Sequence, residues 1–148
     1  MNSAQCVQEL TRRAFSPEFH VHAKPLRGTV VLVEDEEFLR DLAGDVLECA
    51  GHRVLKARDG KAAAALFQRY GKIVELLLTD VVLPGKSGRE LAKQMRELHP
   101  QLKVMFISGY AENMITRSRG GEAAVCYLQK PFSAAALLER VDQLLGAR

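Results

Sequence analysis

The chain has 148 residues, of which 47% are hydrophobic and 26% are charged, as in an ordinary soluble globular protein. This length supports one compact domain, and no apolar run approaches the roughly 20 residues that a membrane helix needs. The net charge of +3 comes mostly from residues 1–28, and the nearly neutral remainder argues against nucleic-acid binding.

Residues 1–28 stand apart from the rest of the chain. Their second half contains two prolines and a glycine, and they lack the periodicity of residues 29–148. We therefore expect an arm or interdomain linker over residues 1–28 and a single domain over residues 29–148.

From Thr29 onward, short apolar runs rich in β-branched residues alternate with longer amphipathic stretches. The runs predict strands at 29–33, 53–57, 75–79, 103–107 and 124–128. The stretches predict helices at 38–51, 60–71, 87–100, 111–121 and 132–146. This pattern is typical of repeated βα units. We expect a doubly wound α/β fold, with a five-stranded parallel sheet in the flavodoxin-like order 2-1-3-4-5 and helices on both faces.

Charged and polar residues follow four of the expected strands. Glu34 and Asp35 follow the first, Asp80 the third, Ser108 the fourth and Lys130 the fifth. Because the carboxyl ends of parallel strands share one edge, these side chains are expected to converge there.

Clustered carboxylates repel one another unless a cation is bound, and oxygen-only ligands favour Mg²⁺ or a similar hard ion such as Mn²⁺. Asp80 would then be free to attack a phosphoryl donor, while the metal and Lys130 balance the charge on the transferring group. Alone, each feature has a plainer explanation, such as a helix cap, a turn residue or a surface cation. Their conjunction in this order favours the functional interpretation.

Four segments resemble motifs of the response-regulator receiver family: VVLVEDE (30–36), LLLTDVVLPGKSG (76–88), MFISGYAE (105–112) and CYLQKPF (126–132). The resemblance extends over about 29–145. It implies that Asp80 is the phosphoacceptor. It also implies that Asp35 binds Mg²⁺ directly, that Glu34 acts through water in place of the commoner Asp, and that the Val82 carbonyl oxygen completes the metal shell.

The same resemblance assigns the remaining site residues. Ser108 would donate a hydrogen bond to the bound phosphoryl group, and Lys130 would contact it. Pro131 would follow a cis peptide bond, and Tyr127 would be the aromatic residue that turns inward on activation. Val82 and Tyr110 would flank the path of the attacking water, and their bulk favours slow dephosphorylation.

The resemblance further implies signalling rather than substrate turnover. The phosphoryl donor would be a histidine kinase or a histidine phosphotransfer protein. The fourth and fifth expected helices (111–121 and 132–146) and the fifth strand (124–128) would form the output face and a surface for a homodimer. The chain would be either the receiver of a hybrid histidine kinase or a single-domain regulator.

Three cysteines, Cys6, Cys49 and Cys126, show neither pairing nor metal-ligand spacing, and the amino terminus lacks the apolar stretch of a secretory signal. We therefore expect a cytoplasmic protein.

Three alternatives compete with this interpretation. A phosphohydrolase of the haloacid dehalogenase kind would carry Asp-x-Asp, but Val81 and Val82 follow Asp80. A flavodoxin-like cofactor binder would open its first helix with a glycine-rich loop, which is absent from this sequence. A receiver that serves only for docking would not need the complete residue set.

Overall fold

The computed structural model describes residues 4–5, 27–109 and 125–146 of the chain. In this part, the elements follow in the order β1 (Thr29–Val33), α2 (Glu37–Cys49), β2 (Arg53–Ala57), α3 (Gly60–Tyr70), β3 (Leu76–Asp80), α4 (Gly88–Leu98), β4 (Lys103–Ser108), β5 (Val125–Gln129) and α5 (Ala134–Leu145). None of the helices described here has the length and apolar character needed to span a membrane.

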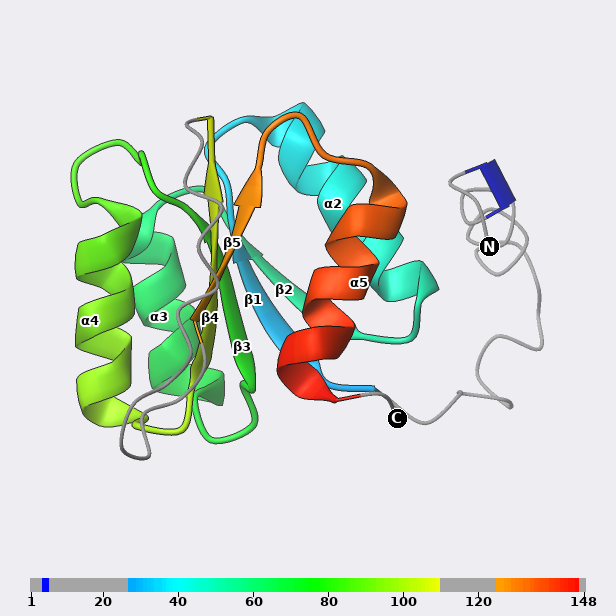
Figure 1. Ribbon diagram of the computed structural model, residues 1–148. Helices are drawn as coiled ribbons and strands as arrows, with labels where there is room; N and C mark the ends of the chain where they lie inside the picture. The colour runs from blue at the N-terminus through cyan, green and yellow to red at the C-terminus, as the bar shows by residue number, and fades with distance from the viewer. Residues whose placement is uncertain (1–3, 6–26, 110–124, 147–148) are drawn as a thin grey trace, which may run out of the picture.

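The five strands form one parallel sheet in the order β2-β1-β3-β4-β5, which confirms the doubly wound fold expected from the sequence. Figure 1 shows α3 and α4 on one face of the sheet and α2 and α5 on the other. Since all strands run the same way, their carboxyl ends lie along one edge. β1 and β3 are neighbours in the sheet, so residues that end these two strands lie close together.

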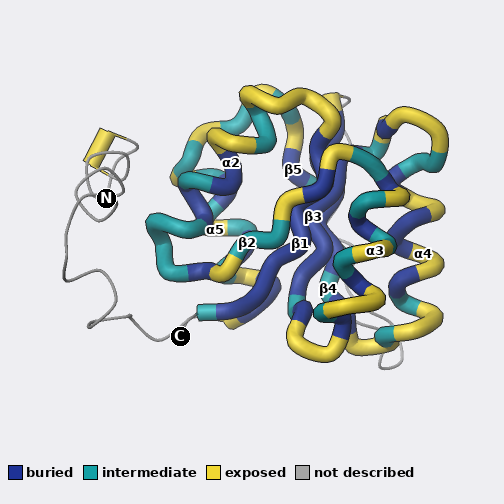
Figure 2. The backbone as a smooth tube through the Cα atoms, turned by 180° about the vertical axis from the view of Figure 1, so that it is seen from behind, coloured by how far each residue is buried: buried dark blue, intermediate teal, exposed yellow. Residues whose placement is uncertain are grey.

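Two apolar cores fill the space between the sheet and its helices. Successive strand residues point to opposite faces. Leu32 therefore packs in the core with α2 and α5, whereas Val31 and Val33 pack in the core with α3 and α4. Both β1 and β3 are buried along their whole length (Figure 2). Burial on both faces explains their uninterrupted apolar sequences.

Side-chain caps begin three of the four described helices. Asp59 caps α3, Ser87 caps α4 and Ser133 caps α5, each by accepting a hydrogen bond from the backbone N–H three residues further on. Gly71 follows the last residue of α3. The ends of these helices therefore lie close to the positions that the sequence predicts.

Three strands differ from the prediction by one residue at their ends. β3 covers Leu76–Asp80 rather than 75–79, because Asp80 pairs with Ile107 of β4. β4 extends to Ser108 and β5 to Gln129, each one residue beyond its predicted end, because these two residues pair with each other. Asp80 and Ser108 are thus the last residues of their strands rather than the first residues of loops. The helix predicted over 111–121 lies outside the described residues, as does most of the arm predicted over 1–28.

Two of the three cysteines lie in the described part of the chain. Cys49 is the last residue of α2, and Cys126 of β5 is a buried free thiol. Cys6 lies outside the described residues.

Candidate functional site

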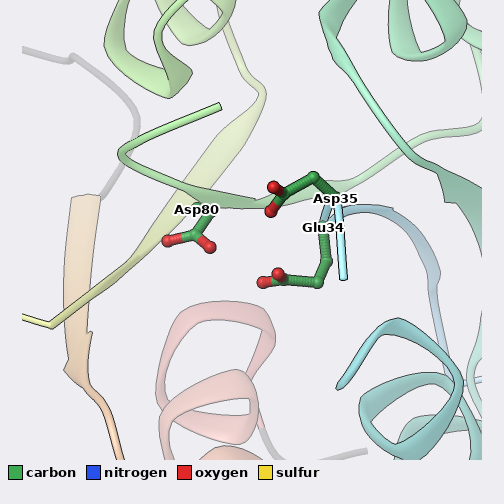
Figure 3. A group of neighbouring side chains, drawn as sticks. All are labelled: Glu34, Asp35 and Asp80. Atoms are coloured by element: carbon green, nitrogen blue, oxygen red, sulfur yellow. The ribbon is translucent and has the colours of Figure 1, made fainter. Parts of the chain in front are cut away.

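Three carboxylates from two neighbouring strands meet at the carboxyl edge of the sheet. Glu34 and Asp35 follow β1 directly, and Asp80 ends β3. One oxygen of each carboxylate lies within 4.8 Å of the others. Figure 3 shows the three side chains turned toward a common space. Glu34 and Asp80 are buried, whereas Asp35 is exposed. The convergence expected from the strand ends therefore holds for all three acids.

A lysine from another strand end lies among these acids. Lys130 Nζ is 2.7 Å from Asp80 Oδ2 and 3.2 Å from Glu34 Oε2, and it donates a hydrogen bond to each. The Lys130 backbone N–H donates to the Ser108 carbonyl oxygen at 2.7 Å. The peptide bond between Lys130 and Pro131 is cis. The loop after β5 is thus attached to the end of β4, and its lysine bridges the two buried carboxylates.

Burial and charge alter the protonation of this group. Burial raises the pKa of Glu34, and the hydrogen bond and negative charge of Asp80 raise it further, to about 7. The Glu36 backbone N–H and the Lys130 ammonium act in the opposite direction without cancelling the effect. Burial lowers the pKa of Lys130, but the hydrogen bonds and charges of Asp80 and Glu34 together raise it above its ordinary value. Lys130 is therefore a fixed positive charge, whereas Glu34 exchanges its proton near neutral pH.

The first turn of helix α4 lies against the backbone that follows β3. The Gly88 backbone N–H at the start of α4 donates to the Val81 carbonyl oxygen at 2.9 Å. The Asp80 carbonyl oxygen accepts a hydrogen bond from Thr79 Oγ1 of β3 at 3.0 Å. A Cβ atom on Gly88 would overlap the Asp80 carbonyl oxygen. Gly88 is not among the site residues predicted from the sequence, although its place in the first turn of the helix after Asp80 is a usable signal.

Other predicted site residues lie around the acids at different depths. Ser108 is buried at the end of β4. Val82 lies two residues after Asp80 and is 68% exposed. Tyr110 lies outside the described residues.

Tyr127 contacts Arg89, which is not among the site residues predicted from the sequence. Tyr127 pairs with Phe106 of β4 across the sheet. Its hydroxyl accepts a hydrogen bond from Arg89 Nη1 at 2.8 Å. Arg89 is the second residue of α4 and lies 38 positions away along the chain, so no local sequence pattern could have paired the two.

The arrangement combines oxygen donors with a fixed positive charge. Carboxylate oxygens are the ligands that Mg²⁺ prefers in proteins, and repulsion between ionised Glu34 and Asp80 favours a bound cation. The Lys130 ammonium is placed to balance added negative charge at Asp80. The site can therefore bring a hard cation and an anionic group to the same carboxylate.

Comparison with known proteins identifies relatives over most of the chain. The family model of the response regulator receiver domain matches residues 30–142. The chain is 36% identical over 117 residues to the sensor kinase CckA of Brucella abortus, covering 79% of this chain and 12% of the kinase. It is 33% identical over 118 residues to the response regulator receiver protein CpdR of the same species, covering 80% of this chain and 97% of CpdR. The chain thus spans a small part of one relative and nearly all of the other.

Solved structures show the same fold. The receiver domain of the hybrid histidine kinase CckA is similar with a TM-score of 0.68 and 36% identity, covering 80% of this chain and 99% of that domain. A response regulator receiver domain protein from Clostridium thermocellum is similar with a TM-score of 0.69 and 22% identity, covering 80% and 94%. The second likeness concerns the fold alone.

Proposed function

Because this chain belongs to the response regulator receiver domain family, we propose that it accepts a phosphoryl group on Asp80 in a two-component phosphorelay. The observation that carries the proposal is the contact of 2.7 Å between Lys130 Nζ and Asp80 Oδ2 within a cluster of carboxylates. The cluster lies at the carboxyl ends of the strands, where open parallel sheets place their working groups. Asp80 would act as a nucleophile of the kind that forms aspartyl phosphates.

We infer that Mg²⁺, or Mn²⁺, binds among the three carboxylates. The donor set fits a hard cation, because it consists only of oxygens that lie within 4.8 Å of one another. Asp35 and Asp80 would bind it directly, the Val82 carbonyl oxygen would complete the protein ligands, and Glu34 would act through water. When bound, the cation supplies positive charge that stabilises the transferring group.

The transfer itself takes place at Asp80. A carboxylate oxygen of Asp80 forms a bond to phosphorus while the bond between phosphorus and the donor's histidine nitrogen breaks, and that nitrogen keeps the electron pair. The aspartyl phosphate carries roughly one and a half to two negative charges. Lys130 balances this charge, and the Ser108 hydroxyl donates a hydrogen bond to a phosphoryl oxygen. Ser108 is suitably placed because its neighbour Ile107 pairs with Asp80.

Phosphorylation is proposed to change the shape of the β5 side of the domain. Ser108 would move toward the phosphoryl group, and Tyr127 would follow it. The face formed by residues 111–121, β5 and α5 would then exist in two discrete arrangements that differ in their affinity for a partner, a second copy of the chain included. Hydrolysis of the aspartyl phosphate resets the switch, and the side chains at Val82 and Tyr110 are proposed to slow it.

The proposed phosphoryl donor is a histidine kinase or a histidine phosphotransfer protein in the cytoplasm. Phe38 is 70% exposed and Leu42 is 44% exposed. They lie one turn apart on the same side of α2, which begins two residues after Asp35. An apolar pair exposed beside the phosphoacceptor supports a protein donor. The two relatives illustrate the alternative contexts, a receiver within a hybrid kinase and a single-domain regulator.

Replacement of the phosphoacceptor tests the proposal. The Mg²⁺-loaded chain would be incubated with acetyl phosphate and examined by intact mass spectrometry. The wild type should gain one phosphoryl group, and Asp80→Asn should gain none. Asp59→Asn is the matched control, because Asp59 also follows a strand at this edge but caps α3 outside the cluster. Labelling of Asp80→Asn at the wild-type rate would contradict the assignment.

Removal of the metal is a separate test. Labelling of the wild type should stop in excess chelator and return when Mg²⁺ is added, because the carboxylates then regain their cation. The Asp35→Asn variant should need a much higher Mg²⁺ concentration for the same labelling. Labelling that continued unchanged in chelator would refute the metal site.

A further inference from the structure

Arg89 connects the first turn of α4 with two aromatic rings. Its Nη1 donates to the Tyr127 hydroxyl at 2.8 Å. Its Cζ lies 5.4 Å from the Tyr127 ring centroid and 5.3 Å from the Phe106 ring centroid. The two rings are paired across β4 and β5, with centroids 5.4 Å apart and planes inclined by 31°. One guanidinium therefore contacts both rings and the hydroxyl.

These contacts restrict the position of Tyr127. A planar guanidinium can lie over aromatic faces and donate to a hydroxyl at the same time, which a lysine ammonium cannot reproduce. Turning the Tyr127 ring elsewhere breaks its hydrogen bond and its cation–π contact with Arg89. The position of Tyr127 is thus set in part by a residue outside its own strand.

Arg89 is also attached to the phosphoacceptor through its neighbour in sequence. Gly88 lies so close to Asp80 that a Cβ atom would overlap the Asp80 carbonyl oxygen. The Gly88 backbone N–H is hydrogen-bonded to Val81. The first turn of α4 therefore cannot shift without disturbing the backbone of Asp80, and Arg89 extends from this turn to Tyr127.

We propose that Arg89 is a positioning residue of the phosphorylation switch, which holds Tyr127 in the position described here and opposes its movement when Asp80 is phosphorylated. This inference rests on the proposed function, because it requires that Tyr127 moves. A contact made in only one of two arrangements changes the equilibrium between them. By linkage it also changes the affinity for the phosphoryl group or its mimic.

The affinity of the Mg²⁺-loaded full chain for beryllofluoride, a phosphoryl mimic, tests this role. Arg89→Gln should bind beryllofluoride about fivefold more tightly than the wild type, since it loses the hydrogen bond and the cation–π contacts. Arg89→Lys, which keeps the charge, should behave similarly. Lys93→Gln is the matched control, because Lys93 is exposed one turn further along α4. The Mg²⁺ affinity without beryllofluoride should be the same in all four proteins.

A double-mutant cycle with Tyr127→Phe identifies the path of the effect. In the Tyr127→Phe background, Arg89→Gln should tighten beryllofluoride binding only about twofold, because the hydrogen bond is already absent. A fivefold effect that persisted there would show that Arg89 does not act through the Tyr127 hydroxyl and would overturn the inference.

The outcomes separate this inference from the proposed function. If the wild type does not bind beryllofluoride with Mg²⁺, the proposed function fails and the role of Arg89 fails with it. If the wild type binds beryllofluoride but Arg89→Gln binds it equally or more weakly, the proposed function stands and the role of Arg89 is refuted.

Discussion

β1 and β3 are buried both in their middle and at their carboxyl ends, but the buried side chains differ. They are apolar in the middle and carboxylic at the ends. In the middle, Leu32 and Leu78 are completely buried, and at the ends Glu34 and Asp80 are 3% and 8% exposed. Burying an apolar side chain stabilises the fold by about 1.5–3 kcal/mol. Burying a carboxylate costs free energy unless it is paired, and Lys130 offsets only part of that cost.

The apolar middle of β1 and β3 therefore stabilises the fold, whereas the buried carboxylates at their carboxyl ends destabilise it. The middle of each strand is covered by helices on both faces, so only apolar side chains fit there. The carboxyl ends adjoin loops, where Asp35 is exposed and a cation can enter. We therefore expect substitutions in the middle to change stability and substitutions at the ends to change chemistry first.

The largest expected effect is on stability, at the middle of β3. Leu78→Ala should lower the free energy of unfolding by about 4 kcal/mol, because it leaves a cavity in a completely buried position. Urea unfolding would measure the loss, and the folded fraction should keep its Mg²⁺ affinity. Leu42→Ala is the control, since Leu42 is 44% exposed and its loss should change stability little. A loss below about 1 kcal/mol for Leu78→Ala would contradict the contrast.

The next largest effect is a pH dependence of the free energy of unfolding, which arises from Glu34 at the carboxyl end of β1. The pKa of Glu34 is about 7 in the folded protein and near 4.5 when unfolded, so the folded state binds this proton more tightly. The resulting stabilisation is complete below pH 4.5 and is lost as the pH rises through about 7. It amounts to roughly 3 kcal/mol. Urea unfolding in chelator across this pH range would measure it.

Glu34→Gln provides the control for this pH dependence. The amide has the size of the protonated acid but does not ionise, so its stability should not fall between about pH 4.5 and 8. At about pH 8 in chelator the variant should therefore be more stable than the wild type. A pH dependence equal to that of the wild type would assign the titration to another group.

The same contrast explains which features could be predicted from the sequence. Apolar periodicity predicts the five strands to within one residue, because burial on both faces leaves no other composition for β1 and β3. Strand order then brings Glu34, Asp80 and Lys130 to one edge. The pKa of Glu34 could not be predicted, because it depends on the depth of burial and on the distance to Asp80. The contact between Arg89 and Tyr127 depends on how α4 packs, which no local pattern encodes.

A smaller loss of stability is expected at Gly88, where the first turn of α4 packs closely against the carboxyl end of β3. Gly88→Ala should destabilise the protein by about 2 kcal/mol, because the added Cβ overlaps the Asp80 carbonyl oxygen. Acetyl phosphate labelling should slow as well, since the backbone of Asp80 must shift. Gly109→Ala is the control, because a Cβ atom added at Gly109 would meet open space. Gly85→Ala would not serve, because Gly85 has a positive φ of 77°, which strains an alanine whatever space surrounds it. Equal stability of the two variants would contradict the close approach.

The smallest effect separates two acidic residues that look alike in the sequence. Asp35 and Asp59 each follow a strand at the carboxyl edge and precede a helix. Asp59 accepts a hydrogen bond from the Ala62 backbone N–H at 2.8 Å, whereas Asp35 belongs to the carboxylate cluster. Asp59→Ala should therefore lower the free energy of unfolding by about 1 kcal/mol and leave the Mg²⁺ affinity unchanged.

Asp35→Ala should give the opposite result, with little change in stability in chelator and a large loss of Mg²⁺ affinity. Urea unfolding and Mg²⁺ titration of the two variants side by side would measure both quantities. If Asp59→Ala weakened Mg²⁺ binding as much as Asp35→Ala does, acidity along the whole edge, rather than the cluster of Glu34, Asp35 and Asp80, would determine where the cation binds. Retention of full Mg²⁺ affinity by Asp35→Ala would remove Asp35 from the site, because a direct ligand cannot be lost without weakening the binding of its cation.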